Sequence, residues 1–340
     1  MDEMMDRNTE RLAARPAEES PSGGTSEQDV ATTENELLAV PGEEATLGSR
    51  LRRAALPSLL VAGGIGALEL LRGRFQHANT FLPERYPDGL WHPENYGLPV
   101  EDVWFESADG LRLHGWWIAH RRARGTVLFC HGNAGNITHR IGAYRFLRRT
   151  GLNVLTFDYR GYGRSEGRPS ERGVCADARS AHDFLVRELG EDPSRILLFG
   201  HSLGGAIAID TALHRPVAGL VSQSTFVDLR EMARERYPRL PLHLAARSSF
   251  KSIRKVAALD LPKLFIHGTS DETIPFSHGQ RLFEEAAGPK EWYAIQGAGH
   301  NDVHRHGGLR YLWKLVRFSR RALQWAREQP QPLRIAVELA

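Results

Sequence analysis

The sequence is poor in cysteine, since only Cys130 and Cys175 occur among its 340 residues. Two cysteines exclude a disulfide-stapled scaffold and a zinc module built on several thiolates, and they are compatible with a reducing compartment. Lysine is also scarce: only five of the 44 basic residues are lysine, and the arginines form no long basic tract. Because no motif that binds DNA or RNA accompanies them, we expect no nucleic-acid partner.

The remaining composition is that of a globular protein, with 41% hydrophobic and 25% charged residues and enough Phe, Trp and Tyr for a sizeable core. The charge is divided unevenly along the chain. Residues 1–50 contain 12 acidic and 4 basic side chains, a net charge of −8, and no aromatic residue, whereas residues 51–340 carry a net charge of +11. A segment like residues 1–50 buries too little apolar area to offset its ordering entropy, so we predict a disordered acidic tail.

A hydrophobic segment at 51–74 follows this tail. Its apolar run, 54–71, holds one charge, Glu69, and is flanked by arginines at both ends. As a helix it would span about 27 Å, close to the ~30 Å hydrocarbon core of a bilayer. No basic flank opens the chain, which argues against a secretory signal. We therefore expect a single membrane anchor of undecided orientation on an otherwise cytoplasmic protein, with an amphipathic or core-docked helix as the alternative.

Residues 75–330 show alternating strand and helix patterns, followed by a short tail at 331–340. Two strand-like runs, 100–107 and 111–120, are joined by a hairpin turn signal. Six apolar runs then predict strands, at Thr126–Cys130, Asn153–Tyr159, Arg195–Gly200, Gly219–Gln223, Lys263–His267 and Glu291–Ile295. Helical patterns intervene at Asn136–Arg149, Glu171–Leu189, Leu203–Leu213, Ser277–Ala286 and Leu309–Trp325. Short apolar runs between helices are typical of a parallel sheet covered on both faces, so we predict an α/β fold with a mixed, mostly parallel sheet of about eight strands.

The most informative motif is Gly-His-Ser-Leu-Gly at 200–204, which lies between an apolar run and a helical pattern. In a nucleophile elbow the serine occupies a sharp strand-to-helix turn, and the residues two positions away on either side must be small. Gly200 and Gly204 meet that requirement. We identify Ser202 as the candidate nucleophile, because the motif is preceded by a predicted strand and followed by a predicted helix, as a nucleophile elbow requires.

A serine nucleophile needs a base, and the base needs an acid that orients it. In an elbow protein they follow in the order serine, acid, histidine. Asp271 lies in a loop after the 263–267 strand, and His300 lies in a glycine-rich loop after the 291–295 strand. These two residues are our candidates for the acid and the base. Asp228 and Glu272 are the competing acids.

Three nearby histidines, His300, His304 and His306, resemble a metal cluster, but no carboxylate-rich motif accompanies them. We therefore expect no metal. The stretch 158–167, DYRGYGRSEG, lacks the Gly-Lys-Ser/Thr ending of a phosphate-binding loop, so we expect it to line the mouth of the pocket and we expect no cofactor.

An acyl-transfer site also needs two backbone donors for the oxyanion. The Leu203 N–H, directly after the candidate nucleophile, is one. The second is expected in the loop after the 126–130 strand, where we assign the Asn133 N–H, with Ala134 as the alternative. For His131 we expect a structural part in shaping that loop.

Several motifs occur together in one order: Phe81–Trp91 (FLPERYPDGLW), His131–Asn136 (HGNAGN), Asp158–Ser165, the Gly-x-Ser-x-Gly pentapeptide and His267–Asp271 (HGTSD). The chain resembles, over about residues 75–325, the α/β-hydrolase superfamily, and within it the membrane-anchored α/β-hydrolase-domain serine hydrolases. The resemblance implies the α/β-hydrolase fold, the triad Ser202, Asp271 and His300, and a membrane segment before the domain. The acidic tail is not part of the family pattern.

In the proteins that this chain resembles, substrate choice depends on a lid between the sixth and seventh strands, here about 226–259. A short, Pro-containing insert predicts an irregular lid over an accessible cleft. We predict a serine hydrolase of the carboxylesterase, lipase or thioesterase type that cleaves an ester or thioester of a small acyl compound or lipid through an acyl-enzyme. The alternatives are a non-catalytic scaffold and a serine peptidase or acyltransferase on the same fold.

Overall fold

The computed structural model describes residues 80–236 and 250–329. The predicted acidic tail (1–50), the apolar segment 51–74 and the C-terminal residues 331–340 lie outside these ranges, and so does the membrane anchor expected at 54–71. Within the two ranges, none of the helices combines the length and the apolar composition that crossing a bilayer requires.

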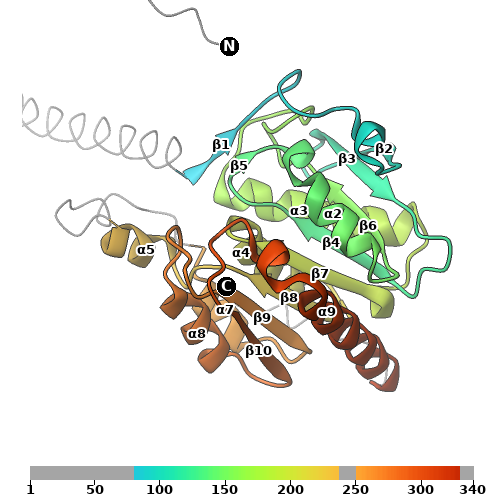
Figure 1. Ribbon diagram of the computed structural model, residues 1–340. Coiled ribbons are helices and arrows are strands. Elements are labelled where there is room, and N and C mark those ends of the chain that lie inside the picture. The colour runs from blue at the N-terminus through green and yellow to red at the C-terminus, as the bar shows by residue number, and fades with distance from the viewer. Residues whose placement is uncertain (1–79, 237–249, 330–340) are drawn as a thin grey trace, which may run out of the picture. The chain divides into compact units, whose positions relative to one another are not determined.

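An eight-stranded sheet forms the centre of the described structure (Figure 1). Its order is β2-β3-β6-β4-β7-β8-β9-β10. The strands are β2 (Glu101–Glu106), β3 (Arg112–Ile118), β4 (Thr126–Cys130), β6 (Asn153–Phe157), β7 (Ile196–His201), β8 (Gly219–Gln223), β9 (Lys263–Gly268) and β10 (Lys290–Ile295). The six strands from β6 to β10 are parallel, whereas β2 and β3 form an antiparallel hairpin at one edge. The predicted fold class, a mixed and mostly parallel eight-stranded sheet, is confirmed.

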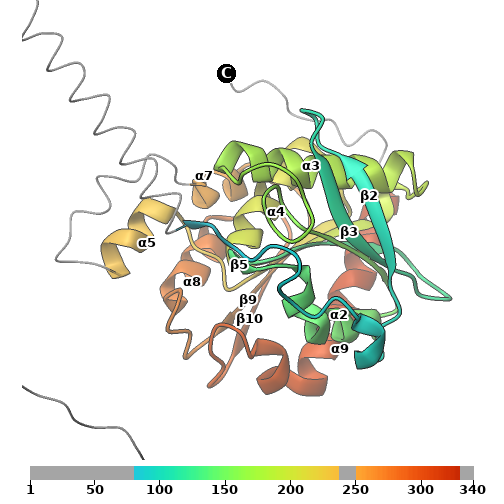
Figure 2. The same cartoon turned by 90° about the horizontal axis from the view of Figure 1, so that it is seen from above.

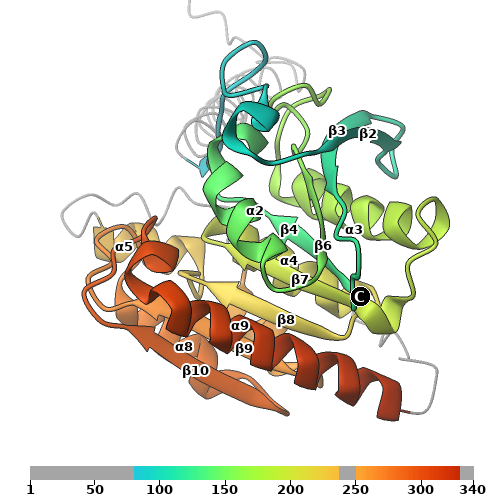
Figure 3. The same cartoon turned by 45° about the vertical axis from the view of Figure 1, so that its right-hand side comes forward.

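Helices cover both faces of this sheet, which gives the protein two cores. Figure 2 shows α3 and α4 on one side and α2 and α9 on the other. One core includes side chains of α3 (Glu171–Arg187), α4 (Leu203–His214), α7 (Ser252–Ala257) and α8 (Phe276–Glu285). The other includes side chains of α2 (Ile141–Arg148) and α9 (Val303–Glu328), and α9 runs alongside α2 and across β8 to β10 (Figure 3).

The two-sided covering explains the sequence pattern of the strands. Every residue of β4, β7, β8 and β9 is buried, so these strands read as continuous apolar runs. The edge strand β2 instead alternates between exposed and buried positions from Asp102 onward, because only one of its faces packs on the core. Ser202 and Asp271, which follow β7 and β9, are therefore attached to fully buried strands.

Short elements complete the described part of the chain. A small two-stranded sheet pairs β1 (Leu82–Pro83) with β5 (Ala134–Gly135), and 3₁₀ helices occur at η1 (Pro93–Tyr96), η2 (Ile137–Arg140) and η3 (Pro193–Arg195). In the lid region, α5 (Leu229–Arg236) is tied to α8 by a hydrogen bond from His278 Nε2 to Glu235 and by an ion pair between Arg281 and Glu231. The proline-containing segment 237–243, on which the irregular lid was predicted, lies outside the described residues.

Candidate active site

The serine motif forms a sharp turn at the carboxyl end of β7. The Ser202 backbone has φ 57° and ψ −122°, a conformation that residues other than glycine rarely adopt. Helix α4 begins at the next residue. Its backbone N–H donates to the carbonyl oxygen of Gln223 on β8 at 2.9 Å, which fixes the turn to the neighbouring strand. A Cβ atom on Gly200 would overlap the backbone of Gly204, and one on Gly204 would overlap the carbonyl oxygen of Cys130. Both glycines are therefore required by close backbone packing, as the motif predicts.

Asp271 and His300 are brought together by the loops that follow β9 and β10. His300 Nδ1 donates to Asp271 Oδ2 at 2.8 Å. The other carboxylate oxygen accepts the backbone N–H groups of Thr273 and Ile274, both at 2.9 Å. Burial of the Asp271 carboxyl opposes its ionisation, but hydrogen bonds from His267 and His300 outweigh burial and hold its pKa well below the ordinary value. Asp271 is therefore a fixed negative charge behind His300.

Ser202 and His300 line the same cavity, but Ser202 Oγ forms no hydrogen bond with His300 Nε2 or with any other described residue. In enzymes without substrate this hydrogen bond is often long and tightens when substrate binds. The structure thus brings the acid and the base into direct contact, and it places the serine beside them without closing the final link.

Two buried histidines support this arrangement, and neither was predicted from the sequence. His267 Nε2 lies 3.0 Å from the carbonyl oxygen of Ile274 and 3.3 Å from Asp271 Oδ2, so it steadies the acid from behind. His201 Nε2 donates to the backbone carbonyl oxygen of His300 at 3.0 Å. Burial, together with the charges of His300 and Arg140, lowers the pKa of His201 to about 3, so this histidine is neutral. For His267, the spacing His-x-x-x-Asp at 267–271 is the sequence pattern that could have indicated its contact with Asp271.

The competing residues have other partners. Asp228 Oδ1 accepts the backbone N–H groups of Arg230 and Glu231, so it caps the start of α5. Glu272 is exposed. His306 Nδ1 pairs with Asp302 at 3.2 Å, whereas His304 lines the cavity beside Ser202. The three histidines of the 300–306 stretch thus point to different partners and do not gather around a common centre.

The loop after β4 lies against the candidate nucleophile. A Cβ atom on Gly132 would stand only 3.5 Å from Ser202 Cβ. The carbonyl oxygen of Asn133 accepts hydrogen bonds from the Leu82 N–H at 3.0 Å and from the Tyr162 hydroxyl at 2.8 Å. In the described part of the chain neither the Asn133 N–H nor the Leu203 N–H donates a hydrogen bond, so both predicted oxyanion donors are available.

Below this loop lies a buried polar layer. His131 is fully enclosed, its Nδ1 lies 2.7 Å from the carbonyl oxygen of Gly132, and burial lowers its pKa to about 4. The Tyr159 hydroxyl donates to the carbonyl oxygen of His131 at 2.9 Å. The expectation that 158–167 lines the mouth of the pocket is wrong, because none of these residues lines the cavity beside Ser202. The Tyr159 and Tyr162 hydroxyls instead donate to the backbone carbonyl oxygens of His131 and Asn133.

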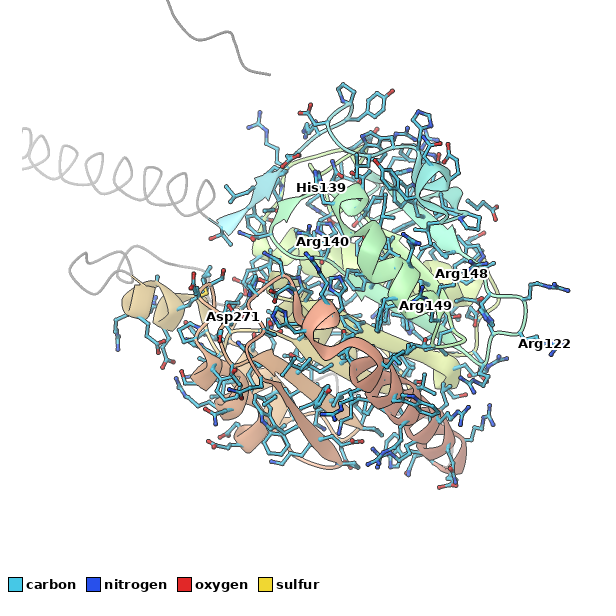
Figure 4. The ribbon with its side chains drawn as sticks, in the orientation of Figure 1. Arg122, His139, Arg140, Arg148, Arg149 and Asp271 are labelled. Carbon is cyan, nitrogen blue, oxygen red and sulfur yellow. The ribbon has the colours of Figure 1, made fainter. Side chains whose placement is uncertain are left out.

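The cavity in front of Ser202 has a volume of about 650 Å³. Its floor is apolar, with Phe129 and Phe199 from β4 and β7, and its wall is formed by Phe146 of α2 and Tyr311 of α9. Figure 4 shows His139 and Arg140 on the segment that leads into α2, and Asp271 on the loops facing it. The site can therefore hold an apolar chain against its floor while a carbonyl group stands at Ser202.

Comparison with known proteins supports this picture. The profile of the hydrolase family described as serine aminopeptidase, S33, matches residues 121–255. An uncharacterized protein of Mycobacterium tuberculosis is 42% identical over 224 residues, which cover 65% of this chain and 80% of that protein. The alpha/beta hydrolase domain-containing protein WAV2 of Arabidopsis thaliana is 37% identical over 278 residues, 75% of this chain and 89% of its own length.

Solved structures show the same fold. The esterase Pf2001 of Pyrococcus furiosus superposes with a TM-score of 0.59 at 23% identity, covering 71% of this chain and 98% of the esterase. An alpha-beta hydrolase from Vibrio vulnificus superposes with a TM-score of 0.56 at 24% identity, covering 64% of this chain and 81% of that one. The predicted α/β-hydrolase fold is thereby confirmed.

Proposed function

Because this chain belongs to the α/β-hydrolase superfamily, we propose that it is a serine hydrolase that cleaves a carboxylic ester or thioester. The proposed nucleophile is Ser202, the base is His300 and the orienting acid is Asp271. The observation that carries the proposal is the hydrogen bond between Asp271 and His300, because His300 lines the same cavity as a serine on a strained strand-to-helix turn. A non-catalytic scaffold has no need of a buried carboxylate and a strained serine at one cavity.

The proposed reaction has two halves. His300 Nε2 takes the Ser202 hydroxyl proton while Oγ attacks the carbonyl carbon, and Asp271 stabilises the imidazolium that results. The Asn133 and Leu203 N–H groups bind the oxyanion. The tetrahedral intermediate then expels the alcohol or thiol, which leaves with the proton from His300. Water then attacks the acyl-enzyme and gives one proton to His300. As the second tetrahedral intermediate breaks, His300 returns this proton to Ser202 Oγ, which releases the carboxylic acid and restores the Ser202 hydroxyl.

The charge of the cavity favours an ester or thioester over a peptide with a free amino terminus. An aminopeptidase must hold a positively charged amino group, which a carboxylate does best. Glu84 is the carboxylate among the described lining residues, and its Oε2 already lies 3.3 Å from His139 Nε2. The same lining contains Arg140 and Arg305, which would repel an ammonium group. We therefore place ester and thioester substrates ahead of amino-terminal peptides.

A fluorophosphonate probe tests the proposal, because it reacts with a serine that a neighbouring base has activated. Wild type should be labelled and give a labelled peptide containing Ser202, whereas Ser202→Ala and His300→Ala should not be labelled. Circular dichroism would establish that all three proteins are folded. A folded wild-type protein that resists labelling would point to a non-catalytic scaffold instead.

A series of p-nitrophenyl esters of increasing chain length tests the acyl half of the proposal. The apolar floor formed by Phe129 and Phe199 should favour medium or long chains over acetate. A steady fall in kcat/KM from acetate upward would argue against an acyl-chain or lipid substrate. Adding an alcohol as competing acceptor would show whether water or another hydroxyl takes the acyl group.

A further inference from the structure

The cavity beside Ser202 has an excess of positive charge. Its charged or ionisable lining residues, apart from His300, are Glu84, His139, Arg140, His201, His304, Arg305 and Tyr311. Since Glu84 is paired with His139, the two arginines have no matching carboxylate in the lining. Neither arginine forms an ion pair with any residue that the structure describes. The described lining of the cavity therefore carries more positive than negative charge.

Arg140 is the better placed of the two. It belongs to η2, one position before α2, and Figure 4 shows it between that helix and the loops that carry Asp271. Its Nη2 donates to the carbonyl oxygen of Ala134 at 3.0 Å, which anchors one side of the guanidinium next to the oxyanion loop. Its Nε is enclosed and has no hydrogen-bond partner in the described part of the chain. Its Nη1 makes a 3.4 Å contact with the carbonyl oxygen of His139, and no carboxylate among the described residues pairs with the guanidinium, so its charge is not neutralised within the lining of the cavity.

Arg305 lines the same cavity from the start of α9. It lies in the first turns of α9, is exposed, and forms no side-chain hydrogen bond among the described residues. The neighbouring His304 also lines the cavity, and burial lowers its pKa, as does the charge of Arg305. Two guanidinium groups in the lining of one cavity suit an oxyanion, because each can donate charge-assisted hydrogen bonds to it.

We propose that the cavity is an anion subsite, in which Arg140 and Arg305 bind a carboxylate or phosphate group of the ester or thioester that Ser202 attacks. This assignment rests on the proposed function for the reaction at Ser202. Binding of the anion to the two arginines does not depend on that reaction. The substrate then has an acyl chain on the apolar floor and an anionic group between α2 and the start of α9. The anion lies either on the acyl chain or on the leaving alcohol.

Matched pairs of esters distinguish these two sources. On the acyl side, mono-4-nitrophenyl adipate is compared with 4-nitrophenyl hexanoate, which has the same chain length without the carboxylate. On the alcohol side, hexanoyl glycerol phosphate is compared with hexanoyl glycerol. We expect at least one pair to show a kcat/KM about tenfold or more higher for the anionic ester, since charge-assisted hydrogen bonds are of that strength. The pair with the larger ratio identifies where the anion lies.

Arg140→Gln and Arg305→Gln should reduce that ratio, by about tenfold or more for Arg140→Gln. Arg149→Gln is the matched control, because it removes the same charge from the far end of α2, outside this cavity (Figure 4). It should leave the ratio at the wild-type value. Added salt should lower the ratio in wild type and have less effect in Arg140→Gln. A ratio near one in wild type, or an unchanged ratio in Arg140→Gln, would overturn the proposal.

A binding measurement separates the failure of this inference from the failure of the proposed function. Ser202→Ala is titrated calorimetrically with hexanoyl glycerol phosphate, mono-4-nitrophenyl adipate and their neutral counterparts. Tighter binding of an anionic ester, lost in Ser202→Ala combined with Arg140→Gln, supports the subsite even if wild type hydrolyses nothing. Equal binding of anionic and neutral esters rejects the subsite even if fluorophosphonate labels Ser202.

Discussion

His201 donates a hydrogen bond from Nε2 to the backbone carbonyl oxygen of His300 at 3.0 Å, and the two rings lie 4.9 Å apart. The residue directly before the candidate nucleophile thus holds the loop that carries the candidate base. The nucleophile elbow therefore does more than position Ser202. The His201 side chain, which precedes Ser202, also holds the loop that carries His300 close to the elbow.

This contact makes His201 a positioning residue. His201→Phe should lower kcat about tenfold or more while leaving KM within a factor of two, because a small displacement of His300 weakens proton transfer more than substrate binding. His201→Gln, which keeps a donor, should recover part of kcat. The measurement is steady-state hydrolysis of p-nitrophenyl hexanoate. Equal kcat in wild type and His201→Phe would contradict the assignment.

Asp271 and Asp228 offer a direct comparison of two candidate acids. Asp271→Asn should lower kcat by about 10⁴, because the amide cannot stabilise the imidazolium or fix its tautomer. Asp228→Asn should leave turnover near wild type, because its carboxylate caps α5 and does not contact His300. Both variants would be assayed with the same ester and checked for folding. The reverse order of effects would transfer the acid role to Asp228.

Two buried histidines should make the protein sensitive to mild acid. Burial lowers the pKa of His131 to about 4 and that of His201 to about 3. In the unfolded chain a histidine titrates near its ordinary pKa of about 6.5, so below that value the unfolded state binds more protons. The free energy of unfolding should therefore fall as pH drops from about 6.5 to 4, by up to about 1.4 kcal/mol per pH unit for each histidine.

Urea denaturation at several pH values between 7 and 4 measures this slope. His201→Gln should remove about one histidine's share of it, since the replacement cannot be protonated in the unfolded chain. His92→Gln is a suitable control, because His92 is largely exposed. A slope that stays the same in His201→Gln would show that other groups cause the acid sensitivity.

Two glycines near the site should respond in opposite ways to alanine. Gly204→Ala places a methyl group on the carbonyl oxygen of Cys130, so it should destabilise the protein by about 3 kcal/mol or more. Gly142→Ala lies within α2, where the new Cβ meets nothing closer than His304 Nε2 at 3.9 Å, and it should stabilise by about 0.5–1 kcal/mol. Thermal unfolding of both variants checks the pair. A Gly204→Ala protein as stable as wild type would be incompatible with the elbow geometry.

Strand positions were predictable because burial on both faces leaves a continuous apolar signal. Thr126–Cys130 and Gly219–Gln223 have the predicted bounds of β4 and β8. The last helix was less predictable: its helical pattern was predicted from Leu309, but α9 begins at Val303 and kinks at Gly308, where φ is 49°. The kink lets two helical pieces join, and no local pattern distinguishes a kink from a helix start.

For the candidate site, the sequence indicated the side chains that directly follow strands, such as Asp271 and His300. It did not indicate the side chains that enter the cavity from other segments, such as Arg140 and Arg305. The loops after β9 and β10 meet because neighbouring parallel strands end at the same edge, so the contact of Asp271 with His300 follows from the topology. Arg140 and Arg305 converge from distant segments, on η2 and α9, and nothing in their local sequence marks this. Their common place in the lining of the cavity depends on how α2 and α9 pack against each other and on the sheet.

The strand order also has a consequence during protein synthesis. The ribosome makes the chain from the N-terminus, so His201 emerges 99 positions before His300, and β9 and β10 join the sheet edge last. Until they join, Ser202 has neither the base nor the acid proposed for it. The nascent chain therefore lacks the complete proposed site during most of its translation, and this site forms only when almost the whole domain has been made.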